Sequence, residues 1–165
     1  MELRKAVVLL VVLTATGLMA GDAVDFSGTW ILDESRLVDT GEGPGMEAVK
    51  IVVKQDSGAL AAEKSFSNPM MGDFTVNETV TLDGKACVSA LEWGEGTRTA
   101  TAVWSEDMSR LTIKSLFRMQ WQGQESEMGA MEIWSLEPGV LKIEATRESP
   151  MGIMERVLYY NKHQE

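Results

Sequence analysis

The sequence predicts an all-β fold, an up-and-down antiparallel meander closed into a barrel of about eight to ten strands. From residue 48 onward, short segments rich in Val, Ile, Thr, Leu and aromatic residues are separated by turn residues, without a helical period. Polar turns marked by Gly58, Gly84, Arg110 and Gly139 recur at intervals of 26, 26 and 29 residues, which fits two strands per period. Such a meander should close, because closure removes exposed strand edges.

Residues 1–23 are expected to be a secretory signal and not part of the fold. A short basic start is followed by the apolar run Ala6–Leu13, and small residues precede two candidate cleavage sites, after Ala20 or after Ala23. The apolar core is shorter than the ~20 residues that span a bilayer. Residues 24–165 have the length of a single domain. We therefore expect a secreted or periplasmic protein with no integral membrane segment after signal removal.

Charge and composition exclude several classes of function. The chain has 25 acidic and 15 basic side chains, a net charge of −10, so nucleic acid and anionic membranes are poor partners. Cys87 is the only cysteine, which rules out an intramolecular disulfide. His163 is the only histidine and lies near the C-terminus, which argues against His-based hydrolysis or a His-rich metal site. No cofactor and no metal is expected.

The first strand is expected at residues 26–32. One of its two faces carries Phe26, Gly28, Trp30 and Leu32, so Trp30 should point into the core. Gly28 lacks a side chain on that face, which indicates that something large comes close to the backbone there.

The other strands follow in the same way, with apolar and polar residues alternating as in half-buried antiparallel sheets. In one, Phe74, Val76 and Val80 oppose threonines and an asparagine; in another, Phe117 and Met119 oppose charged and polar residues. The remaining strands are expected at residues 48–55, 59–67, 73–82, 86–93, 97–105, 110–121, 126–136, 140–148 and 152–161.

The two ends of such a meander differ. The compact polar turns all connect an even strand to the next odd one, so they share an end. The longer, Gly-rich loops meet at the other end and carry Met70, Met71 and Met151. Flexible Met side chains suit an adaptable apolar entrance, although Met also fills gaps under loops.

The Phe-x-Gly-Thr-Trp segment at Phe26–Trp30, the long first connection and the last strand with Arg156–Tyr160 resemble the calycin superfamily, above all bacterial secreted lipocalin-like proteins. The resemblance implies a ligand-holding barrel in which Trp30 plugs the closed end, Arg156 lies over Trp30, and the Met-bearing end is the mouth. Similarity to fatty-acid-binding proteins is more distant: the connection at residues 33–47 is too short for their two helices, and their Arg-x-Tyr motif is absent.

Five charged residues fall on faces that are otherwise apolar. A buried charge without a partner costs several kcal/mol, so three interpretations are open. The charges hold an anionic headgroup, or they form a self-satisfied ion-pair network, or some face solvent because the strand register is shifted by one residue. Faces around residues 86–93 and 126–136 are ambiguous. The five residues are Glu78, Arg98, Glu132, Arg147 and Arg156.

These observations favour an exported, non-catalytic binding protein that holds a small hydrophobic or amphipathic ligand in the barrel. The residues expected at the cavity and mouth are Phe74, Val76, Glu78, Phe117, Met119, Trp121, Arg147, Met70, Met71 and Met151, and those expected to close the barrel are Gly28, Trp30 and Arg156.

The first alternative is a protein-interaction module with a filled barrel, whose apolar residues would lie outside. A second is an isomerase or cyclase that uses Glu78 and Glu132 as acid and base, since burial in an apolar cavity raises a carboxyl pKa. A third is Cu(I) binding by converging thioethers. The methionines concerned are Met70, Met71, Met128, Met131, Met151 and Met154.

Overall fold

The computed structural model of the protein describes residues 22–37, 47–69, 72–121, 123–150 and 152–164. The predicted signal segment lies almost entirely outside these residues. One short 3-10 helix, η1 (Glu34–Arg36), follows the first strand. In the described part of the chain, no helix is long and apolar enough to cross a membrane. The strands are β1 (Gly28–Leu32), β2 (Ala48–Gln55), β3 (Ala59–Asn68), β4 (Gly72–Thr81), β5 (Cys87–Ala90), β6 (Gly96–Trp104), β7 (Arg110–Trp121), β8 (Gln124–Glu137), β9 (Val140–Ser149) and β10 (Gly152–Lys162).

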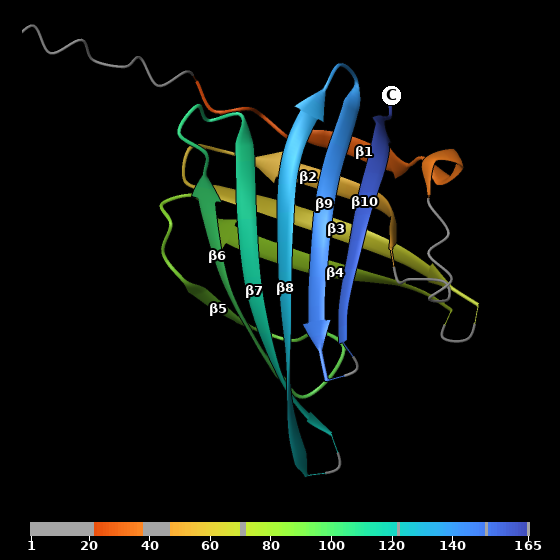
Figure 1. Ribbon diagram of the computed structural model, residues 1–165, viewed down its shortest axis with the longest axis vertical. Coiled ribbons are helices and arrows are strands. Elements are labelled where there is room, and N and C mark those ends of the chain that lie inside the picture. The colour runs from red at the N-terminus through yellow and green to blue at the C-terminus, as the bar shows by residue number, and fades with distance from the viewer. Residues whose placement is uncertain (1–21, 38–46, 70–71, 122, 151, 165) are drawn as a thin grey trace, which may run out of the picture.

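All ten strands belong to one antiparallel sheet in the order β4-β3-β2-β1-β10-β9-β8-β7-β6-β5. Sequence neighbours pair with one another except β4 and β5, and the pairing of β1 with β10 joins the two halves of the chain. The result is a nearly closed barrel, which confirms the predicted all-β meander. In Figure 1, β1 to β4 form a back wall that crosses the front wall of β7 to β10, and the β7–β8 hairpin projects beyond the rest.

Strand positions follow the alternation read from the sequence, with two differences. The fifth strand is short, because the Leu91 amide donates to the Gly96 carbonyl and turns the chain early. The first strand begins at Gly28, because the chain before it crosses the end of the barrel. There the Val24 amide donates to the Met108 carbonyl and the Phe26 amide donates to the Gln55 side chain.

The core lies at the end of the barrel that holds the compact turns. Phe26 stacks on Trp104, with ring centroids 5.9 Å apart, and meets Trp134 edge-on at 5.8 Å. Trp30 is buried and its indole Nε1 donates to the Phe26 carbonyl at 2.9 Å, so its only polar group is satisfied. The other large, fully buried side chains are Tyr160, Ile51, Leu60, Leu111, Leu141 and Val80.

A lysine, not an arginine, covers Trp30. The Lys162 Nζ lies 5.3 Å from the Trp30 ring, and a Cβ on Gly28 would lie 3.2 Å from the Lys162 Cε. The close approach expected at Gly28 therefore comes from Lys162. The expectation that Arg156 lies over Trp30 is wrong, because the register of the sheet places Lys162 opposite Trp30. Arg156 precedes Lys162 by six residues on β10 and pairs with Ala145 of β9.

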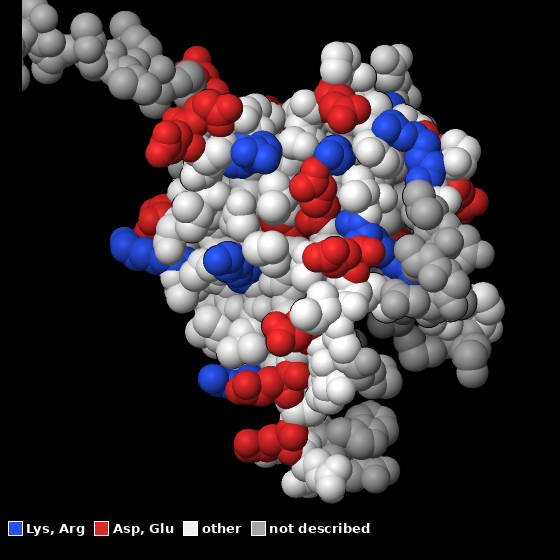
Figure 2. Space-filling model, viewed as in Figure 1, with Lys and Arg blue, Asp and Glu red and all other residues white. Residues whose placement is uncertain are grey.

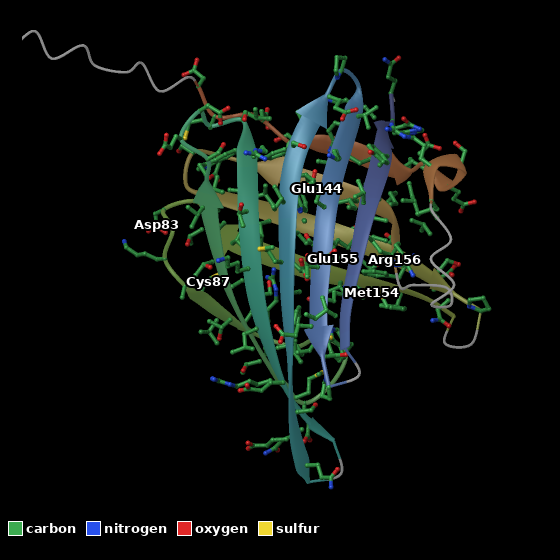
Figure 3. All side chains as sticks on the ribbon, viewed as in Figure 1. Asp83, Cys87, Glu144, Met154, Glu155 and Arg156 are labelled. Atoms are coloured by element: carbon green, nitrogen blue, oxygen red, sulfur yellow. The ribbon has the colours of Figure 1, made fainter. Side chains whose placement is uncertain are left out.

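The barrel has one seam, between β4 and β5, where the described residues form no ladder and side chains bridge instead. The Glu92 carboxylate accepts from the Asn77 amide at 3.0 Å, and the Cys87 thiol donates to the Thr79 carbonyl at 3.4 Å. Figure 3 shows Cys87 on β5 at this side of the barrel. These contacts close the edge of β4 without backbone pairing.

Candidate functional site

The buried Lys64 of β3 is the centre of a group of charged side chains inside the barrel. Its Nζ lies 2.9 and 3.0 Å from the two carboxylate oxygens of Glu132 and 3.0 Å from the Glu78 Oε2. Lys64 is only 7% exposed, so its charge depends on these two carboxylates and not on water. We call Lys64, Glu78, Arg98, Glu132 and Arg147 the interior charge cluster.

The contact between Lys64 and Glu132 joins opposite walls of the barrel. Between β3 and β8 the sheet order has four strands on one side and four on the other. In Figure 1, β3, which carries Lys64, belongs to the back wall, and β8, which carries Glu132, belongs to the front wall. The pair therefore crosses the interior, and it separates the packed core at the end with the compact turns, which we call the closed end, from the part of the interior at the opposite end.

Arg98 of β6 extends the cluster across the seam. Its Nη2 lies 3.4 Å from the Glu78 Oε2, and its Nε donates to the Ser115 hydroxyl at 3.1 Å. The guanidinium carbon lies 6.0 Å from the Phe117 ring centroid. Because Glu78 belongs to β4, this pair links the two strands that flank β5.

Glu132 receives three kinds of stabilisation as an anion. Lys64 binds both oxygens, the Trp134 indole donates at 2.8 Å, and the positive charge of Arg147 acts on it from β9. Burial raises the pKa of Glu132, but the charge of Lys64 and these hydrogen bonds lower it more, so its pKa lies below the ordinary 4.5. Likewise burial lowers the pKa of Lys64, and the charges of Glu132 and Glu78 raise it more, to above 10.5.

This geometry argues against one of the alternatives. An enzyme that uses Glu132 as acid or base needs a raised pKa at this carboxyl. The pKa of Glu132 is lowered instead, because the Lys64 ammonium lies beside it. Glu132 is an ion-pair partner in this structure.

The alternation of residues correctly placed Glu78, Arg98 and Glu132 inside the barrel. Their contacts with one another and with Lys64 correspond to the ion-pair network among the three interpretations, and no shift of register occurs in their strands. Lys64 itself was missed. The signal was present, since Leu60, Ala62 and Phe66 share one face of the third strand and Lys64 falls between them.

Arg156 has a different role. Its Nε forms an ion pair with the Glu47 Oε1 at 3.0 Å, and both side chains are largely buried. Glu47 precedes β2, so the contact fastens the end of the first long connection to the last strand. Met154 and Arg156 are both labelled on β10 in Figure 3.

Toward the end of the barrel opposite the compact turns, inward-facing side chains are only partly buried. Glu78 keeps 18% and Glu132 21% of its side-chain surface open, although both point into the barrel. Phe66 and Phe74 stack with centroids 4.9 Å apart. We call this region the open half of the interior. Its other partly buried inward-facing side chains are Val76, Phe117, Met119, Met128 and Met154.

The structure thus brings Phe74, Val76, Phe117 and Met119 of the predicted site to the open half. Met70, Met71 and Met151 lie outside the described residues, as does the side chain of Trp121. Of the methionines considered for Cu(I), Met131 lies on the outer face, because its neighbour Glu132 points inward. Within the described residues, no group of three or more His, Cys, Asp or Glu side chains could hold a metal ion.

Two cavities of the described structure lie outside the interior. One, of about 580 Å³, is on the outer face of β8 to β10, between the apolar Met131, Ile133 and Val157 and the end of η1 at Leu37. Arg36 lies over the Tyr159 ring beside it, at 3.3 Å. The other, of about 440 Å³, is at the closed end. We call the first the outer groove.

The visible outer surface carries acidic and basic side chains side by side, with carboxylates along the projecting β7–β8 hairpin (Figure 2). Among the five members of the interior charge cluster, three are cations and two are carboxylates.

Fold and site together define an antiparallel β-barrel with an apolar plug, an internal ion-pair network and a partly open interior. No protein-family model, curated protein or solved structure matches this chain.

Proposed function

We propose that the protein is an exported, lipocalin-like, non-catalytic carrier that holds a small amphipathic molecule in the open half of the interior. The observation that carries the proposal is the exposure of Glu78 and Glu132, which face inward and yet keep about a fifth of their side-chain surface open. A barrel with a filled interior would bury them as completely as it buries Trp134.

The chemistry of this region suits a ligand with one apolar part and one polar end. The stacked pair Phe66 and Phe74, together with Phe117, offers apolar surface near the mouth. The interior charge cluster offers polar contacts further in. Each 100 Å² of ligand surface removed from water there contributes about 2.5 kcal/mol. Few polar contacts in a mostly apolar site are typical of small-molecule binding.

The test is native mass spectrometry of the protein purified from its own host without detergent, followed by organic extraction. We expect an added mass at one copy per chain and recovery of an apolar or amphipathic compound. A clean mass of the protein alone, together with no tryptophan fluorescence response to a panel of apolar probes, contradicts the proposal.

The outer groove supports a second candidate function, a protein-interaction module. Leu37 and Val157, which line the groove, are 36% and 43% exposed. A partner protein would bury these side chains and leave the interior untouched. Replacing Val157 by Asp would then abolish partner capture from the host's envelope fraction, whereas the carrier proposal expects ligand binding to be unchanged by this substitution.

A further inference from the structure

We propose that the polar end of the ligand is an anion, of carboxylate type, held by the guanidinium of Arg98; this inference rests on the proposed function. Arg98 is 95% buried and lies on the inward face of β6, above Ala100 and Ala102. Its hydrogen-bond partners are Ser115 and Glu78, which hold the guanidinium in place.

Arg98 has hydrogen-bond donors to spare. A guanidinium carries five N–H donors, and in the described structure Arg98 uses its Nε on Ser115 and its Nη2 on Glu78. The contact with Glu78 is long, at 3.4 Å. In the described structure the Arg98 Nη1 makes no hydrogen bond and is not enclosed, so it stays accessible. Together with Nη2, once Nη2 leaves Glu78, it can bind the two oxygens of one carboxylate in parallel.

Neighbouring side chains hold the Arg98 guanidinium in one position. Ser115 fixes the Nε side of the guanidinium and the Phe117 ring lies beside it at 6.0 Å. Glu78 is the competitor: its Oε2 is shared between Lys64 and Arg98, and Lys64 holds it more closely, at 3.0 Å. An incoming anion can therefore replace the weaker contact while the contact with Lys64 stays.

The test measures displacement of the neutral probe 1-aminoanthracene from the purified protein by ten-carbon compounds that differ in their polar end. The compounds are decanoate, decan-1-ol, decylamine and decyl phosphate, all below their micelle concentrations. We expect decanoate to displace the probe at a concentration about ten-fold lower than decan-1-ol, because it gains charge-assisted hydrogen bonds, and decylamine to be weakest. If decyl phosphate binds more tightly than decanoate, the polar end of the ligand is still an anion, but the assignment of that anion as a carboxylate is overturned.

Two variants change this preference in opposite directions. Arg98→Met should abolish the advantage of decanoate and leave decan-1-ol unchanged. Glu78→Gln should increase the advantage several-fold, because it removes the competing carboxylate. The matched control is Arg118→Met, on the exposed outer face of β7, where Arg118 binds Glu127; it should behave as the wild type.

The outcomes separate this inference from the proposed function. Equal displacement by decanoate and decan-1-ol, or an unchanged preference in Glu78→Gln, overturns the assignment of the anion to Arg98 and leaves the carrier intact. Absence of any probe binding by the wild type overturns both.

Discussion

Lys64 and Glu132, 68 residues apart in sequence, meet inside the barrel with the Lys64 Nζ 2.9 Å from the Glu132 Oε1. They come from strands on opposite walls. The same lysine binds Glu78, which binds Arg98 on the far side of the seam. One buried cation thus connects the back wall, the front wall and the seam, and it marks the boundary between the packed core and the open half.

Removal of Lys64 should therefore destabilise the whole barrel. In Lys64→Met two carboxylates remain inside with less compensation, so we expect the free energy of unfolding to fall by about 3 kcal/mol or more. The matched control is Lys114→Met on the exposed face of β7, for which we expect a change within about 0.5 kcal/mol. Urea unfolding measures both; equal midpoints for the two variants would show that the cluster contributes little to stability.

Glu132 gives the protein a defined acid dependence. Because its pKa in the folded state is below 4.5, its stabilising contribution is present above the pKa of the unfolded chain and is lost as the pH falls through the folded pKa. The stability difference between wild type and Glu132→Gln should be constant near neutral pH and shrink below about pH 4.5. Urea unfolding at several pH values measures it; a difference that grows as the pH falls below 4.5 contradicts this account.

Trp30 should be essential for the core at the closed end. Replacing it by Ala removes a fully buried indole and its hydrogen bond to Phe26, so we expect a loss of roughly 3 to 5 kcal/mol. Trp93→Ala is the matched control, because Trp93 is 49% exposed. If Trp30→Ala unfolds at the same urea concentration as Trp93→Ala, Trp30 is not the plug of the barrel.

The seam should open more easily than the paired strands. Glu92 accepts the Asn77 amide, which has no strand partner on that side. Glu92→Ala should therefore speed hydrogen exchange at the Asn77 amide by about ten-fold, while amides of β8 and β9 keep their protection. Glu106→Ala, a change in an exposed turn, serves as the control. Unchanged exchange at Asn77 would assign the closing of the seam to other contacts.

Much of the fold could be predicted from the sequence because its signals are local. Alternation fixes which side of a strand faces inward, and Asp56-Ser57-Gly58 and Glu137-Pro138-Gly139 mark turns that the structure contains. The inward position of Trp30 follows from the same rule and is confirmed. Which cation covers Trp30 depends on the register between β1 and β10, which local patterns do not determine. The family resemblance implied Arg156 at this place, and the structure has Lys162.

Only part of the interior charge cluster could be predicted from the sequence, for a related reason. Alternation shows that Glu78, Arg98 and Glu132 share the inward side, but not which of them meet. The partners come from β3, β4, β6 and β8, so their distances depend on how the barrel closes. Lys64 was overlooked because a lysine among alanines and serines reads as a solvated residue, although its position between Ala62 and Phe66 places it inside.

The most direct test of the carrier proposal is to fill the open half of the interior and measure binding of 1-aminoanthracene. Val76 faces inward beside Lys64, whereas its neighbour Thr75 is exposed on the outside of β4. The account predicts one bound probe per wild-type chain, loss of at least about ten-fold in affinity in Val76→Trp, and wild-type affinity in Thr75→Trp. Undiminished binding by a folded Val76→Trp would contradict the account and place the binding site outside the barrel.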